Sequence, residues 1–167
     1  MIGVFREPIP QVHAYMRVSY AFPSRTFQVL TVKALIGLNG YTFTLQPEEV
    51  TCKFEVGVAE GEDFVYLGED EASRLLRAAR RGRFNRMDFI VYAYYRREGG
   101  RRGLWGDLYR VSIVLGGEGL AELQASHVKG TKRIALDELL GKIVELLKVA
   151  AGRRGLPPVE VREARGR

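Results

Sequence analysis

Three runs of alternating apolar and polar residues, joined by glycine-rich segments, constrain the fold of this chain more than any other feature. The runs cover residues 87–97, 107–115 and 119–128, and the joining segments read EGGRRGLWG and GGEG. A period of two is typical of strands, and short glycine-rich connections join strands that pair antiparallel. The sequence therefore predicts a three-stranded antiparallel meander.

The rest of the chain predicts further strands and three helices. Strands are expected over residues 12–22, 41–45, 50–58 and 63–67, where weaker alternation is bounded by proline or glycine. Helices are expected over residues 24–38, 68–82 and 134–152, where apolar residues recur at helical spacing. We therefore expect one α+β domain over residues 1–152, in which an antiparallel sheet containing the meander packs against helices. Residues 153–167 are interpreted as a weakly ordered basic tail.

The positive charge is concentrated in one part of the chain. The net charge of the whole sequence is +6, but residues 74–110 carry eleven basic and three acidic side chains, which gives +8. Residues 1–73 carry −5 and residues 111–167 carry +3. A field concentrated in this way attracts polyanions. The charge pattern therefore favours a nucleic-acid partner.

The first run of the meander places aromatic rings beside basic side chains. Alternation predicts that Ile90, Tyr92, Tyr94 and Arg96 share one face, and that Phe89, Val91, Ala93 and Tyr95 share the other. Rings on an exposed strand can stack on unpaired bases, whereas tyrosines under a covering helix would only pack in the core. Trp105, on a glycine-flanked loop, is a further candidate ring. We expect ligand binding by this segment.

The arginines around the meander supply candidate contacts to phosphates. Arg81 lies in the last turn of the second predicted helix, Arg83 and Arg86 follow that helix, and the remainder lie in or beside the first two meander runs. A solvated helix end would also explain the first group. The predicted contact residues are Tyr92, Tyr94, Trp105, Arg81, Arg83, Arg86, Arg96, Arg97, Arg101, Arg102 and Arg110.

Several other classes of protein are disfavoured. No stretch approaches the roughly 18 apolar residues of a membrane span, and the first residues lack the apolar part of a signal peptide, so we expect a cytoplasmic protein without a membrane partner. Cys52 is the only cysteine, which excludes an internal disulfide framework. His13 and His127 have no metal-ligand partner nearby in the sequence. We expect no metal, no cofactor and no enzymatic activity.

Alternative functions stay open at this point, among them an interaction module whose basic face meets an acidic protein. The acids Glu60, Glu62 and Asp63, or those at residues 69–71, could bind magnesium in a nuclease. An RNA-binding protein is another alternative, because the sequence does not show whether any group reads a 2′-hydroxyl.

The last predicted helix carries a leucine-rich stripe. Leu136, Leu140, Ile143, Leu147 and Ala150 follow a 4-3-4-3 spacing. This spacing is typical of a core helix, and it also suits the seam of a homodimer.

Taken together, these features resemble the archaeal ThermoDBP single-stranded DNA-binding proteins and their shorter related proteins. The shared features are the aromatic strand FIVYAYY, the arginine segments RRGRFNR and RREGGRRG, the domain size and the leucine-rich final helix. Twenty arginines beside six lysines also suggest a thermophilic source. The resemblance implies a groove with apolar and aromatic walls and basic edges that holds single-stranded DNA. It also implies dimers made through the C-terminal region, although this chain has a proline-containing tail in place of a long zipper.

Overall fold

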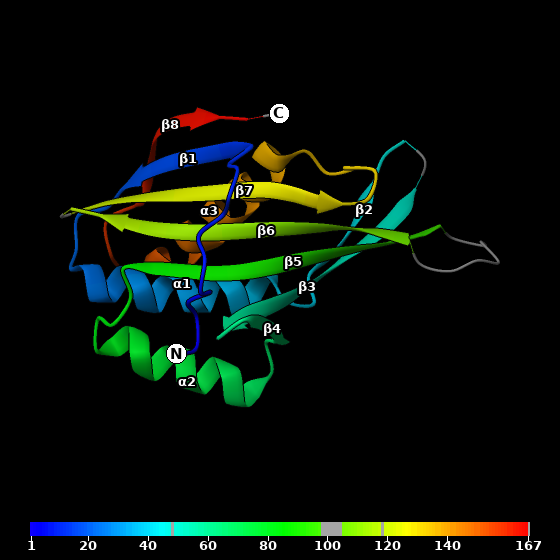
Figure 1. The fold of residues 1–167 in the computed structure, drawn as a ribbon. Coiled ribbons are helices and arrows are strands. Elements are labelled where there is room, and N and C mark those ends of the chain that lie inside the picture. Colours follow the sequence, from blue (N-terminus) through cyan, green and yellow to red (C-terminus); the bar gives the residue numbers. More distant parts are fainter. Residues whose placement is uncertain (48, 98–104, 118, 167) are drawn as a thin grey trace.

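The computed structural model describes residues 1–47, 49–97, 105–117 and 119–166. Within these residues the chain forms eight strands and three helices (Figure 1). The strands are β1 (Ala14–Ser19), β2 (Thr42–Leu45), β3 (Val50–Glu60), β4 (Asp63–Tyr66), β5 (Arg86–Arg97), β6 (Trp105–Gly116), β7 (Leu120–Lys129) and β8 (Glu160–Arg165). The helices are α1 (Ser24–Leu38), α2 (Glu69–Arg80) and α3 (Leu136–Arg153).

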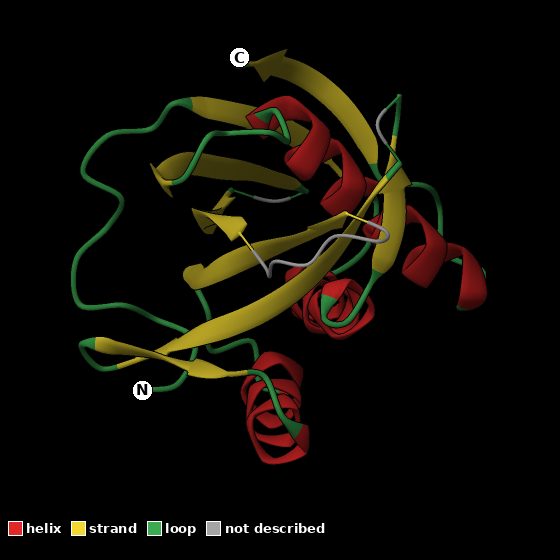
Figure 2. Ribbon diagram, turned by 90° about the vertical axis from the view of Figure 1, so that its right-hand side faces the viewer, coloured by secondary structure: helices red, strands yellow, loops and turns green. Residues whose placement is uncertain are grey.

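The strands form one antiparallel sheet that curls around the helices. Its order is β2-β3-β5-β6-β7-β1-β8, and the short strand β4 pairs with the end of β3. Helices α1 and α3 lie against the inner face of this sheet, and α2 packs beside α1 (Figures 1 and 2). The predicted α+β class with an antiparallel sheet is confirmed.

The alternation along β5 decides which side chains enter the core. Phe89, Val91, Ala93 and Tyr95 are all fully buried, whereas Tyr92 and Tyr94 on the other face are partly exposed. The inward row continues across β6 with Tyr109, Val111 and Ile113. The predicted division of the strand into an inner and an outer face is therefore correct.

The leucine stripe of α3 belongs to the core of a single chain. Leu136, Leu140, Ile143 and Leu147 are at most 1% exposed, and α3 packs against α1, β1 and β7. The stripe side chains are therefore packed within one chain, and a homodimer through the C-terminal helix stays a prediction.

The end of the chain also differs from the sequence-based expectation. Residues 160–165, predicted to belong to a weakly ordered tail, form β8 and pair antiparallel with β1. Val159, just before this strand, is fully buried. The physical reason is that β1 would otherwise present an open row of backbone donors and acceptors at the sheet edge.

The N-terminal segment, residues 1–13, crosses the outer face of the sheet, opposite α1 and α3 (Figures 1 and 2). The Phe5 ring stacks on Phe64 with 4.7 Å between ring centroids, and the Phe5 amide donates a hydrogen bond to Asp88. The segment therefore covers the part of the outer face near the start of β5. The part near the end of β5 is not covered by it.

None of the helices in the described ranges is both long enough and apolar enough to cross a membrane.

Candidate nucleic-acid interface

Tyr92 and Tyr94 form a stacked pair of rings on the outer face of β5. Their centroids lie 4.7 Å apart with an angle of 18° between the ring planes, and both side chains are partly exposed. Tyr94 pairs with Gly106 of the neighbouring strand β6, and this glycine has no side chain that could contact the rings. A Cβ added at Gly106 would lie 3.4 Å from Cε1 of Tyr92. The same Cβ would lie only 2.5 Å from the Ala93 carbonyl oxygen, so close approach of the β5 backbone, more than the rings, requires glycine at this position.

An apolar hollow lies beside the ring pair, between the N-terminal segment and the sheet. Its volume is about 470 Å³, and Leu108, which pairs directly with Tyr92, is in its wall. Ligand-binding cavities commonly have volumes of about 300–1,000 Å³ and mostly apolar linings. The other lining residues are Pro10, Gln11, His13, Phe64, Ile90, Arg110, Ser126, His127 and Val128. The hollow is large enough to accept a base, and Leu108 separates it from the ring pair.

Cationic side chains surround the ring pair on the neighbouring strands. Lys53 of β3 pairs across the sheet with Tyr94, and Lys129 Nζ of β7 lies 6.0 Å from the centroid of the Tyr92 ring. Burial and the nearby Glu55 carboxylate raise the pKa of Tyr94, so this hydroxyl stays neutral at physiological pH. Arg96, the next residue on the same face of β5, is exposed. Two lysines and an arginine can thus reach phosphates of a strand bound over the rings, although Lys53 Nζ also lies 3.8 Å from a carboxylate oxygen of Glu55, the residue opposite Tyr92. We call Tyr92, Tyr94, Lys53, Arg96, Lys129 and the hollow the sheet-face site.

Four further predicted contact residues lie at the end of β5 and beyond it. Arg97 is exposed at the last position of the strand. Arg101 and Arg102 lie outside the described residues, so the prediction for them is not addressed by the structure. Trp105 begins β6, but its side chain is also outside what the structure describes.

Two of the predicted phosphate contacts, Arg86 and Arg110, also have partners within the protein. The Arg86 side chain donates hydrogen bonds to Asp88, at 2.8 Å, and to the Phe5 carbonyl oxygen, at 2.7 Å. The Arg110 guanidinium lies 4.7 Å from the Phe5 ring centroid, and burial lowers its pKa. Both arginines hold the N-terminal segment on the sheet. Arg110 also lines the hollow of the sheet-face site, and contact of these two arginines with nucleic acid stays a prediction.

The remaining predicted arginines, Arg81 and Arg83, are remote from the ring pair. They lie just before β5, whereas Arg96 and Arg97 lie at its far end. Eleven steps along a strand span roughly 36 Å. Strand β5 therefore separates the two groups of predicted arginines, and Arg81 and Arg83 are not part of the sheet-face site.

The sequence analysis did not identify a buried carboxylate that organises this end of the sheet. Asp107 is fully buried and accepts hydrogen bonds from the Tyr95 hydroxyl and from the backbone amides of Lys132 and Arg133. His127 Nε2 lies 2.7 Å from Asp107 Oδ1. These bonds fix the loop after β7, at the same end of the sheet as the ring pair. The signal in the sequence was an aspartate in an otherwise apolar inward row of β6.

Three of the six acids considered for a nuclease have partners within the protein. Glu60 forms an ion pair with Arg74 that lowers the pKa of the glutamate, and Glu62 pairs with Arg6. Glu71 accepts a hydrogen bond from the Gly68 amide at the start of α2. In the described part of the chain, no three His, Cys, Asp or Glu side chains group in a way that could hold a metal ion. The geometry gives the nuclease hypothesis no support.

Comparisons with known proteins do not identify relatives: no family model, no curated protein and no solved structure matches the chain.

Proposed function

We propose that this protein binds single-stranded nucleic acid, DNA in the first instance, at the sheet-face site and without catalysing a reaction. The observation that carries the proposal is the stacked Tyr92–Tyr94 pair, partly exposed on a face of the sheet with cations on both sides. A ring on a strand surface can stack on any unpaired base, because every base has a flat face.

The surroundings of the rings support the same function. The apolar hollow beside Tyr92 offers a second place for a base, and Lys53, Lys129 and Arg96 can neutralise phosphates along the strand. In this proposal β5, β6 and β7 act as a meander platform, with the amphipathic helix α3 supporting the sheet from behind. This function is the one that the resemblance to the ThermoDBP proteins implies. We propose that the protein acts in the cytoplasm, where it would meet single strands of DNA.

A ring substitution tests the proposal most simply. Tyr94→Ala leaves the net charge unchanged, so long-range attraction should persist while one stacking surface is lost. We expect affinity for a labelled single strand of about 15 nucleotides, a length within the usual site sizes, to fall by about 1–3 kcal/mol, or roughly 5- to 150-fold. Fluorescence anisotropy titrations with single-stranded DNA and RNA of the same sequence measure this loss and compare the two nucleic acids.

Two control variants separate stacking from other effects. Tyr94→Phe keeps the ring and removes only the hydroxyl, so it should bind nearly as well as the unchanged protein. Tyr66→Ala removes an exposed ring from β4, outside the sheet-face site, and should leave affinity unchanged. Equal affinities of Tyr94→Ala and Tyr66→Ala would contradict the proposal.

A further inference from the structure

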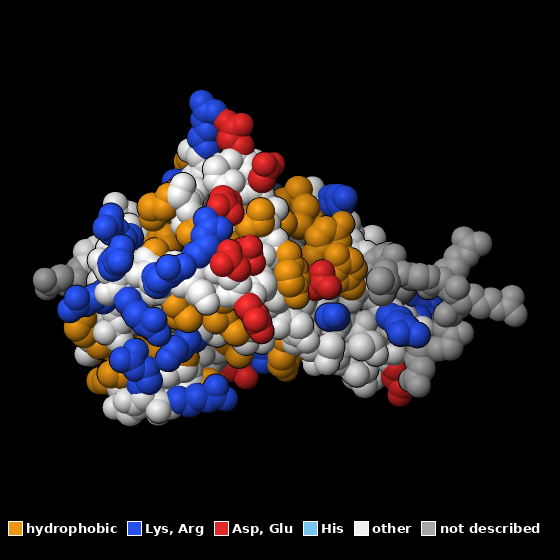
Figure 3. Space-filling model, turned by 90° about the horizontal axis from the view of Figure 1, so that it is seen from below, with side chains coloured by type: hydrophobic (Ala, Val, Ile, Leu, Met, Phe, Trp, Pro, Cys, Tyr) orange, Lys and Arg blue, Asp and Glu red, His pale blue; other side chains and the backbone are white. Residues whose placement is uncertain are grey.

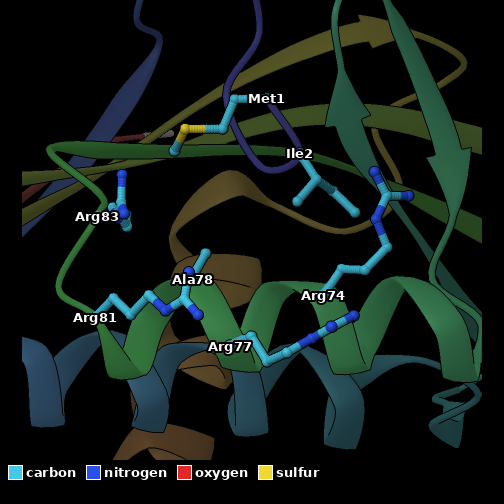
Figure 4. Close-up of a pocket in the computed structure, with 7 residues that line it drawn as sticks. All are labelled: Met1, Ile2, Arg74, Arg77, Ala78, Arg81 and Arg83. Atoms are coloured by element: carbon cyan, nitrogen blue, oxygen red, sulfur yellow. The ribbon is translucent and has the colours of Figure 1, made fainter.

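A second surface, on the helical side of the molecule, carries a dense group of cations. Two hollows, of about 370 and 460 Å³, flank the C-terminal turn of α2. The first is bounded by α2, the loop after it and the N-terminal segment (Figure 4). The second lies between α2 and the ends of α1 and α3. The cations lining them are Arg74, Arg77, Arg81 and Arg83 in the first, and Arg25, Lys33, Arg80 and Arg154 in the second. We call these eight residues the α2 surface.

The two hollows belong to one continuous patch. The Cβ of Arg25 lies within 3.5 Å of the position that a Cβ on Gly82 would occupy, so α1 touches the loop between the two groups of arginines. Seen from below, the Lys and Arg side chains gather over this end of the molecule (Figure 3). Glu69, Asp70 and Glu71 lie at the opposite end of α2.

Most cations of the α2 surface form no ion pair with a carboxylate of the described residues, whereas several arginines elsewhere in the protein do. Arg6, Arg17, Arg86 and Arg162 each pair with a carboxylate. On the α2 surface only Arg74 does so, and no ion pair to a described residue is found for Arg25, Lys33, Arg77, Arg80, Arg81, Arg83 or Arg154. Like charges held close together repel one another, and this repulsion destabilises the fold unless anions neutralise it. The arrangement is therefore suited to a polyanion.

The lining residues also indicate which kind of polyanion fits. Neither hollow has an aromatic or an acidic side chain among its described lining residues, so the surface offers no stacking platform for unpaired bases. It offers instead an extended group of cations on both sides of a helix end. Double-stranded DNA carries one negative charge per roughly 1.7 Å of its axis, on phosphates that are fixed on its outside. A duplex can therefore engage both hollows without unstacking any base.

We propose that the α2 surface binds the phosphate backbone of a nucleic-acid duplex without reading its sequence. This inference goes beyond the single-strand function and does not depend on it, because the α2 surface and the ring pair lie toward opposite ends of β5. If both proposals hold, one molecule can hold a duplex and an unpaired strand at the same time.

A charge-matched pair of double variants tests the inference in the full-length protein. Arg77→Ala with Arg81→Ala removes two exposed cations from the α2 surface, and Arg162→Ala with Arg165→Ala removes the same charge from the exposed strand β8. Affinity for a blunt 20-base-pair DNA duplex is measured by anisotropy between about 50 and 200 mM salt. Each phosphate contact contributes about −0.9 to the slope of log K against log salt.

The expected result is a local effect. The salt slope of the α2 double variant should be shallower by about 1.8, because two phosphate contacts are lost. Between about 50 and 200 mM salt, the factor by which its affinity falls should therefore be about ten times smaller than for the unchanged protein. At about 50 mM salt the variant should bind the duplex at least tenfold more weakly than the unchanged protein does. The β8 double variant should bind as the unchanged protein does. Tyr94→Ala should retain duplex affinity, which distinguishes failure of this inference from failure of the single-strand proposal.

Three results would overturn the inference. One is no measurable duplex binding at about 50 mM salt by the unchanged protein. Another is an equal loss in the two double variants, which would show that only net charge matters. The third is binding of polyglutamate of similar charge with the same affinity and the same loss in the α2 variant, which would identify an acidic polypeptide as the partner. Circular dichroism melting confirms that each variant is folded.

Discussion

At the scale of single residues, Asp107 shows how a buried charge can fix the neighbourhood of a site. Burial alone would raise the pKa of Asp107, but hydrogen bonds from Tyr95, His127 and two backbone amides outweigh burial and lower it. The carboxylate is thus stabilised in its charged form inside the fold. It holds the loop that follows Lys129, one of the cations beside the ring pair.

This geometry predicts how stability depends on pH. A carboxylate with a lowered pKa stabilises the fold above its unfolded value of about 3.9, and this contribution is lost as the pH falls through the folded-state pKa. Asp107→Asn should therefore reduce the free energy of unfolding by about 1.5–3 kcal/mol at pH 7 and by less at pH 3. Urea unfolding at both pH values measures this difference.

The matched control for this prediction is Asp63→Asn, at an exposed carboxylate of β4. It should change the free energy of unfolding by less than about 0.5 kcal/mol at either pH. A loss at Asp107 that stays the same at pH 7 and pH 3 would show that its charge is not what stabilises the loop.

The residues of the candidate site were predictable only in part. The period-two pattern of β5 was sufficient to place Tyr92 and Tyr94 on the face opposite Phe89 and Val91, because alternation is a local property of the backbone. It could not show that Arg86 and Arg110 are used to hold the N-terminal segment. Their partners lie more than 75 positions away in the chain, and only the folded structure brings them together.

At the scale of elements, substitutions in α3 can distinguish a helix of the core from a helix of a dimer interface. Leu147 is fully buried, whereas Val149, two residues later, is 42% exposed. Leu147→Ala should reduce the free energy of unfolding by about 2–5 kcal/mol through loss of packing and creation of a cavity. Val149→Ala should change it by less than about 0.5 kcal/mol.

Chemical denaturation measures both effects, and sedimentation of the same samples reports the assembly. If Leu147→Ala kept its stability but halved the sedimenting mass, the stripe would be a dimer seam and our assignment of it to the core would be wrong.

The elements themselves were largely readable from the sequence, with one exception at the C-terminus. Glycine and proline mark most element ends, so the predicted helix over residues 24–38 coincides with α1. Strand β8 was missed because four of its six residues are charged and because the two prolines before it suggested a disordered tail. Its pairing with β1 depends on an edge formed more than 140 residues earlier, which no local pattern reveals.

At the scale of the whole molecule, the chain separates two kinds of surface that are close together in the sequence. The excess positive charge of residues 74–110 is carried partly by α2 and the loop after it and partly by the end of β5. Strand β5 separates the arginines of α2 and the following loop from the arginines at its own far end. The two groups of arginines therefore lie on different surfaces of the molecule. The charge pattern alone could predict a polyanion partner, but the division into a ring-bearing and a ring-free surface required the fold.

The central claim is that unpaired bases stack on the Tyr92–Tyr94 pair, and site-specific crosslinking tests it most directly. A single strand of DNA containing 5-bromodeoxyuridine is bound to the unchanged protein, irradiated and digested, and the crosslinked residues are located by mass spectrometry. We predict crosslinks at Tyr92 or Tyr94, with Trp105 as a further candidate, and none at Tyr66. Crosslinks confined to residues outside β5 and β6, or no crosslink at saturating DNA, would contradict the account.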